Sequence, residues 1–238
     1  FLIIFGLLAM SNAISGTDPT IKNIKISETV DIKVVITNIK SQKGIMLQTD
    51  GTPHEFFKGN SKKYSLHGFI DDATGIVTGL YLCENECLQG YLEITRQTLR
   101  NFGIPQSIYA DGTNVFFSNN SKELTIEEQL SGLKKHTTQF GEIAEFLGIE
   151  LIHAHSPQAK GKIERLWNTL HDRLRVEFNI NNITTIEQAN IFLKDYIKKY
   201  NRQFAKKPAN KKSAFVPLPK GINLDRLLSA KFIRVPDS

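Results

Sequence analysis

Short apolar runs separated by turn-forming residues begin at residue 45. The runs IMLQTDGT (45–52), YSLHGFID (64–71) and IVTGLYLC (76–83) predict three strands, and the DDATG turn joins the second strand to the third. QSIYAD (106–111) and IELIHA (149–154) predict two more buried strands. The pattern therefore indicates an antiparallel meander of three strands followed by two separate strands.

Helical spacing of apolar residues fills the intervals between and after these strands. It predicts helices over 87–103, 140–148, about 159–178 and, after the cap signal Thr184-Thr185, 186–200. This order of elements predicts an α/β fold, namely a ribonuclease H-like mixed five-stranded sheet flanked by helices, with a helical and basic C-terminal extension.

Three regions follow from this pattern. Residues 1–44 form an N-terminal segment of unclear nature, 45–200 the core, and 201–238 a basic extension that we expect to be a linker or a DNA-facing arm. The uncharged start FLIIFGLLAM resembles a signal-peptide core, but it lacks a basic flank and is too short to span a membrane, so we expect a buried segment or a truncated start. Residues 112–135 are polar and predict an exposed insertion or flap.

Composition narrows the class of protein. Of 238 residues, 40% are hydrophobic and 23% charged, which excludes a disordered chain and a multi-span membrane protein. The net charge of +6 divides unevenly, with +10 over residues 160–238 and −4 over 1–159, so the C-terminal third is the candidate surface for a polyanion. Cys83 and Cys87 stand alone, which predicts half-buried thiols in a reducing cytosol and neither a disulfide framework nor a complete zinc site.

Three acids carry the candidate chemistry. Asp50 lies late in the first predicted strand, Asp111 ends the fourth, and Glu164 lies on the helix after the fifth. Three carboxylates that converge without a basic partner repel one another, so divalent cations are expected to neutralise them. We expect the three acids to share two Mg²⁺ ions about 3.5–4 Å apart, an arrangement suited to phosphodiester chemistry on a nucleic acid.

Four motifs place these acids in a recognisable order: LQTDGTPHEFF, LHGFIDDATGIVTGLY, IYADGTNVFF and HSPQAKGKIERLWNTLHDRL. From about Gly44 to Phe204 the chain resembles the integrase catalytic core of bacterial insertion-sequence transposases, most closely the ISNCY group. The resemblance implies a DDE-type DNA transposase with Asp50, Asp111 and Glu164 as its catalytic, metal-binding acids and Mg²⁺ as cofactor, for which Mn²⁺ can substitute. It also implies binding to transposon ends and target DNA, a homo-oligomeric synaptic complex, and a cytoplasmic, nucleoid-associated location without a membrane partner.

The helix that carries Glu164 also predicts a DNA-binding face, with a solvated basic face as the alternative. The candidate DNA-binding residues are His155, Gln158, Lys160, Lys162, Asn168, His171 and Arg175. The opposite, buried stripe is predicted to consist of Ile163, Leu166, Leu170 and Leu174.

Other residues have structural interpretations that we prefer. Asp71 and Asp72 are rival first acids but are expected to stabilise a turn, and His153 is expected to have a polar or capping role, with His54 and His67 weaker candidates for chemistry. Trp167, Phe56, Phe57, Phe116 and Phe117 could stack on bases, but core packing is expected. Two alternative functions stay open: a ribonuclease H-like nuclease without strand transfer, and a non-catalytic transposase remnant that regulates by binding DNA.

Overall fold

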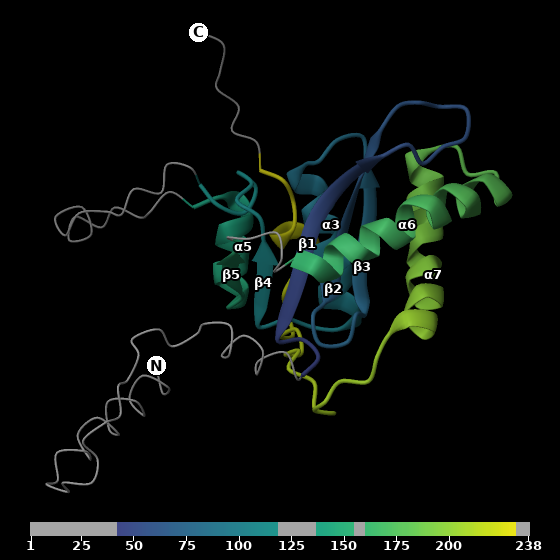
Figure 1. Ribbon diagram of the computed structural model, residues 1–238. Helices are drawn as coiled ribbons and strands as arrows, with labels where there is room; N and C mark the ends of the chain where they lie inside the picture. Colours follow the sequence, from purple (N-terminus) through teal and green to yellow (C-terminus); the bar gives the residue numbers. More distant parts are fainter. Residues whose placement is uncertain (1–41, 119–136, 155–159, 232–238) are drawn as a thin grey trace, which may run out of the picture. The chain divides into compact units, whose positions relative to one another are not determined.

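The computed structural model describes residues 42–118, 137–154 and 160–231, which contain a five-stranded mixed sheet (Figure 1). Its strands are β1 (Met46–His54), β2 (Tyr64–Asp71), β3 (Val77–Cys83), β4 (Ser107–Ala110) and β5 (Glu150–His153). The order across the sheet is β3-β2-β1-β4-β5, with antiparallel pairing from β3 to β1 and parallel pairing from β1 to β5. This topology confirms the predicted ribonuclease H-like sheet.

The helices that follow the strands are α3 (Leu88–Asn101), α5 (Gln139–Leu147), α6 (Gly161–Ile180), α7 (Ile186–Phe204) and the short α8 (Leu224–Leu227). Thr185 and Gln188 form a capping box that starts α7, as the Thr-Thr signal predicted. The helix runs four residues past its predicted end at Tyr200. The Asn201 side chain explains this extension, because it bonds both the N–H and the C=O of Val77 on β3.

Each face of the sheet has its own apolar cluster. On one face Leu66, Leu80 and Leu82 pack against α6 and α7, and the predicted stripe of α6 is buried there. Figure 1 shows α6 lying across this face of the sheet, with α7 beside it. On the other face Leu47, Phe69 and Ile108 pack against α3 and α5.

The described part of the C-terminal extension packs against the second cluster. Phe215, Leu224 and Leu228 are buried, and Val216 forms an antiparallel bridge with Ile104. Gly103 permits this approach: its φ is 104°, and a Cβ there would lie 2.5 Å from the Val216 carbonyl oxygen. Residues 205–231 are therefore not a linker separate from the core, because their scattered apolar side chains find a place in it.

Within the part of the chain that the structure describes, no helix is both long enough and apolar enough to cross a membrane.

Candidate active site

Alternation along β1 turns a row of polar side chains toward α6. Gln48, Asp50 and Thr52 face that helix, because successive side chains of a strand point to opposite faces of the sheet. Each has a partner on α6 or at its start: Gln48 with the backbone at Lys162 and Ile163, Asp50 with Lys160, and Thr52 with His171. The first predicted acid thus lies at the contact between the central strand and the helix that carries the third.

Asp111 joins Asp50 through the parallel pairing of β1 and β4. Gln48 pairs with Tyr109, so continuing the register by two residues places Asp111 beside Asp50 on the same face. The Lys160 ammonium lies 3.0 Å from Asp50 Oδ1 and 3.6 Å from Asp111 Oδ2. The two carboxylates therefore converge on one cation.

Lys160 corrects one expectation from the sequence. The acids were expected to converge without a basic partner, yet this lysine supplies one. The DNA contact predicted for Lys160 stays a prediction; in this structure the residue is 8% exposed and its charge is directed at the two acids. The reason is its position at the N-cap of α6, where the helix meets the sheet beside Asp50.

Glu164 lies in the first turn of α6 and is exposed. It follows Lys160 by four residues, so the two side chains leave the same face of the helix. The start of α6 is fixed by Gln48, which is 1% exposed and whose Oε1 accepts hydrogen bonds from the N–H groups of Lys162 and Ile163, both at 3.1 Å. Gln48 thereby positions the helix that carries Glu164.

Burial dominates the electrostatics of the first acid. It raises the pKa of Asp50 above the usual value of 3.8, whereas the charge and hydrogen bond of Lys160 lower it, and the negative charge of Asp111 raises it further. A half-buried carboxylate of this kind is stabilised by a nearby cation. The site therefore favours positive charge between Asp50 and Asp111.

The remaining predicted DNA-binding residues have different surroundings. Lys162 Nζ lies 3.5 Å from Asp72 Oδ1, while Asn168 and Arg175 are exposed on α6. The His171 ring stacks on His54, with ring centroids 4.2 Å apart and an interplanar angle of 3°, and its Nε2 lies 3.0 Å from the Thr52 hydroxyl. His155 and Gln158 lie outside the described residues. DNA contact stays a prediction for this set.

Of the two rival acids, Asp71 has the turn-stabilising role expected of it, whereas the side chain of Asp72 contacts Gln48 and Lys162. Asp71 accepts hydrogen bonds from the N–H group and the hydroxyl of Thr74, which close the turn between β2 and β3, and from the N–H of Gly44, which precedes β1. Asp72 Oδ1 accepts a hydrogen bond from the Gln48 amide. Both aspartates are buried, and Asp71 pairs in register with Leu47, three residues before Asp50.

Four of the five aromatic candidates are buried, which confirms core packing: Phe56, Phe57, Phe116 and Trp167. Trp167 lies against Gly68, the register partner of Asp50, where a Cβ would be 2.6 Å from the indole ring. Phe117 is half-buried and packs edge-on against His153. The Nε2 of His153 would lie 2.5 Å from a Cβ at Gly112, so this imidazole closely approaches the backbone just after Asp111.

Glu86 is a fourth acid near the site that the sequence pattern did not single out. Its carboxyl carbon would lie 2.8 Å from a Cβ at Gly51, the residue that follows Asp50. The same carboxylate accepts a 2.5 Å hydrogen bond from the Tyr91 hydroxyl. The negative charges of Asp50 and Asp111 contribute to raising the pKa of Tyr91, after burial and Glu86. The available signal was weak, because Glu86 is one of three polar residues in the ENE loop before α3.

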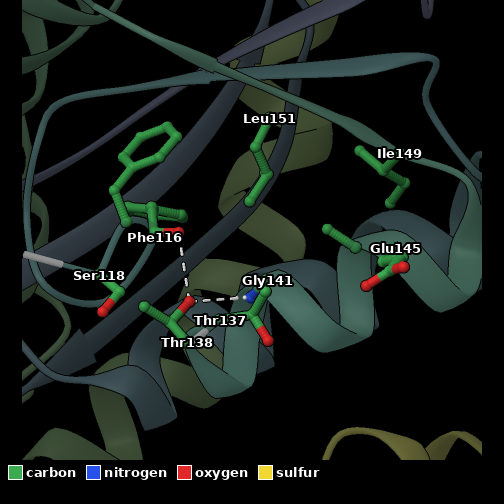
Figure 2. A pocket seen from close by; sticks show the side chains of 10 residues that line it. Phe116, Ser118, Thr137, Thr138, Gly141, Glu145, Ile149 and Leu151 are labelled. Carbon is green, nitrogen blue, oxygen red and sulfur yellow. Dashed lines mark hydrogen bonds between the residues drawn. The ribbon is translucent and has the colours of Figure 1, made fainter. Parts of the chain in front are cut away.

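A pocket lies elsewhere, between α5 and the segment after Asp111. Figure 2 shows Phe116, Leu151 and Ile149 around it, with the Thr138 hydroxyl bonded to the Phe116 carbonyl and accepting from the Gly141 N–H. None of the three acids lines this pocket. The candidate chemistry is thus at the β1, β4 and α6 contact and not in this cavity.

The sequence of this chain is similar to those of known insertion-sequence transposases. The chain is 37% identical over 201 residues to the transposase for insertion sequence IS1202 of Streptococcus pneumoniae, which covers 84% of this chain and 41% of that protein. It is 35% identical over 175 residues to the putative transposase y4bF of Sinorhizobium fredii, covering 74% of this chain and 36% of the relative. The chain thus spans about two fifths of the length of these relatives. No family model matches it.

Similar solved structures include two retroviral ones. The simian T-cell lymphotropic virus intasome in complex with the PP2A regulatory subunit B56 gamma has a TM-score of 0.47 at 17% identity, covering 83% of this chain and 59% of that chain. The HTLV-2 integrase catalytic core domain in complex with magnesium has a TM-score of 0.45 at 17% identity, covering 68% of this chain and 89% of that chain.

The strand order is that of a ribonuclease H-like core, with the three predicted acids on β1, after β4 and on α6. The chain is a homologue of insertion-sequence transposases, which confirms the resemblance carried by its motifs.

Proposed function

We propose that this chain carries the catalytic core of a DDE-type transposase, which cuts DNA at the ends of an element and joins the freed 3′-hydroxyl to target DNA. The supporting observation is that the carboxylates of Asp50 and Asp111, on β1 and just after β4, both approach the Lys160 ammonium. Glu164, one helical turn after that cation, is the third member of the set.

The donors of this site suit a hard divalent cation. Asp50, Asp111 and Glu164 offer carboxylate oxygens, which Mg²⁺ prefers, and they would hold two such ions or Mn²⁺ in their place. When bound, the ions supply the positive charge that stabilises the phosphate oxygens and favours ionisation of the attacking hydroxyl. Without a metal, the Lys160 ammonium holds the two aspartates directed at one point, and a bound ion would have to displace it from their oxygens.

The partners follow from the same proposal. The DNA substrates are transposon ends and target DNA in the bacterial cytoplasm, and bringing two ends together requires a homo-oligomer. The net charge of +10 over residues 160–238 supports a polyanionic partner.

The first test is Asp111→Asn, which removes a metal-binding charge at nearly constant volume. We expect Mg²⁺-dependent nicking of duplex DNA to be abolished, while circular dichroism and much of the DNA affinity stay as in the unmodified chain. Asp195→Asn is the matched control, because Asp195 is exposed and pairs with its helix neighbour Lys198. Undiminished cleavage by Asp111→Asn, or loss of its fold, would contradict the role assigned to Asp111.

A strand-transfer assay with pre-cut ends separates the proposal from its alternatives. Joining of the 3′-hydroxyl end to target DNA supports a transposase. Cleavage without joining indicates a ribonuclease H-like nuclease, and DNA binding with neither reaction indicates a non-catalytic regulator.

A further inference from the structure

Two cysteines and a histidine meet on the α3 side of the sheet, close to the acid site but separate from it. One ligand atom from each of His67, Cys83 and Cys87 lies within 4.8 Å of the others. The pairing of β2 with β3 explains the meeting: Ser65 pairs with Cys83 and His67 with Tyr81, so His67 and Cys83 are diagonal neighbours on one face. Cys87 is the N-cap residue of α3, where the chain returns over that face.

The hydrogen bonds of His67 determine which nitrogen carries its proton. Nδ1 lies 3.3 Å from the Tyr81 carbonyl oxygen, which can only accept, so Nδ1 is the donor. Nε2 is therefore unprotonated, and its lone pair accepts a 3.2 Å hydrogen bond from the Cys87 N–H. A backbone carbonyl on one nitrogen with the other directed at a ligand group is the common arrangement of metal-binding histidines.

The ring is also held firmly in place. His67 is 0% exposed, and Gly90 of α3 lies directly on it, where a Cβ would come within 2.5 Å of Cε1 and Nδ1. Both cysteines are half-buried and unbridged. Burial lowers the pKa of His67 to about 4, so its imidazole is neutral and able to ligate at neutral pH.

We propose that His67, Cys83 and Cys87 form a binding site for a thiophilic divalent cation of the Zn²⁺ class. Two thiolates and one imidazole match the preference of Zn²⁺, and water can complete a tetrahedral shell because both cysteines are only partly buried. Binding displaces the two thiol protons to solvent and replaces the hydrogen bond from the Cys87 N–H. Sequence spacing did not indicate the site, because its third ligand comes from a different strand.

The position of this site suggests its purpose. It connects β2, the end of β3 and the start of α3, and it encloses the loop that carries Glu86. His67 is the register partner of Gly51, which follows Asp50. A bound cation would therefore brace the sheet and helix beside the acid site, whatever reaction that site performs.

The test uses Co²⁺ as a spectroscopic probe of the reduced, chelator-treated chain. Thiolate ligands give Co²⁺ a near-ultraviolet charge-transfer band that carboxylates do not give, so the acid site does not interfere. We expect the unmodified chain and Asp111→Asn to show this band with one equivalent of Co²⁺, and Zn²⁺ to bleach it. Cys83→Ser and Cys87→Ser should each weaken the band, because one thiolate remains, and should weaken Zn²⁺ binding by at least the roughly 10–100-fold that loss of an outer-shell partner costs. Cys83→Ser/Cys87→Ser should lose the band.

Thermal unfolding of a variant without the two aspartates of the acid site gives a second, independent measurement. In Asp50→Asn/Asp111→Asn, Zn²⁺ should raise the unfolding midpoint, and addition of Cys87→Ser should remove that rise. Absence of the thiolate band in the unmodified chain would overturn the proposal, as would an equal Zn²⁺ response with and without Cys87. Conversion of both thiols to a disulfide in the presence of Zn²⁺ would also overturn it.

Discussion

Lys160 contacts both aspartates of the acid site. Its ammonium stands between two carboxylates that would otherwise face each other, in a contact that is mostly removed from water. A hydrogen-bonded charge in such a place stabilises the fold and competes with any other cation for the same oxygens.

Replacing Lys160 with glutamine tests this competition. In the absence of divalent ions, we expect the free energy of unfolding to fall by about 1–3 kcal/mol, because the two carboxylates lose a charged partner. Mg²⁺ should restore stability at a lower concentration than the unmodified chain needs. Urea unfolding in chelator and across a Mg²⁺ titration measures both effects.

Lys162→Gln is the control, because Lys162 pairs with Asp72 and not with the acids of the site. Its response to Mg²⁺ should match that of the unmodified chain. If Mg²⁺ stabilises Lys160→Gln no more than the unmodified chain, the ammonium and the metal do not share a position.

At the scale of elements, the start of α6 depends on a strand residue. Gln48→Leu should lower the free energy of unfolding by about 1–3 kcal/mol, because a buried N–H group and a partly buried one lose their acceptor. Mg²⁺-dependent nicking should fall as well, since the helix that carries Glu164 loses its anchor. Urea unfolding and the nicking assay measure the two effects.

Gln89→Leu supplies the comparison, because Gln89 is exposed and bonds its helix neighbour Glu93. Its stability should stay within about 0.5 kcal/mol of the original. Equal effects of the two substitutions would show that Gln48 has no special role at α6.

The stacked pair of His54 and His171 joins β1 to α6 and gives this contact a pH dependence. Burial lowers the pKa of both imidazoles below 6.5, and the positive charge of Arg175 lowers that of His54 further. The unfolded chain therefore takes up protons first as pH falls below 6.5, so stability is present above that value and is lost as pH falls through the folded pKa values.

We expect His54→Phe to lose less stability than the unmodified chain between about pH 7 and pH 5. Arg175→Gln should reduce the loss without removing the stack, because the folded pKa of His54 rises toward its unfolded value and the loss is then complete at a higher pH. Urea unfolding at both pH values measures these changes. An identical pH dependence in all three proteins would mean that the pair does not titrate as described.

Local patterns predicted the elements well, whereas contacts between distant residues escaped them. The predicted second strand has the observed bounds of β2, and the buried stripe of α6 is the predicted one, since both depend on periodicity within one element. The Lys160 to Asp50 bond joins residues 110 apart, and Gln48 reaches Ile163 across 115 residues. No spacing rule encodes such pairs, because they depend on how a helix crosses the sheet.

At the scale of the whole molecule, the lysines of the C-terminal third differ in whether an acidic side chain lies beside them. Lys160 and Lys162 direct their charges at aspartates within the chain, and Lys198 and Lys199 pair with Asp195 and Glu177. Lys206 and Lys207, just after α7, are exposed, and Lys206 is fixed in place by a 2.8 Å bond from its N–H to the Thr74 carbonyl. Exposed cations free of an acidic partner are the ones that bind phosphates most effectively.

Salt titrations of duplex DNA binding test whether this surface contacts phosphates. The affinity should fall by roughly 0.9 log units per log unit of salt for each phosphate neutralised. Lys206→Ala/Lys207→Ala should weaken binding and reduce that slope by up to about 1.8, while Mg²⁺-dependent chemistry on bound DNA continues. Lys160→Ala/Lys162→Ala tests the DNA contact predicted for these two lysines near the cut site, and it should weaken binding but reduce the slope less, because both charges are directed at aspartates. Lys198→Ala/Lys199→Ala removes the same charge from paired lysines and should change the slope less. Unchanged affinity and slope in the first two double variants would make the basic residues a solvated face, because phosphate contacts cannot be lost without releasing fewer counterions.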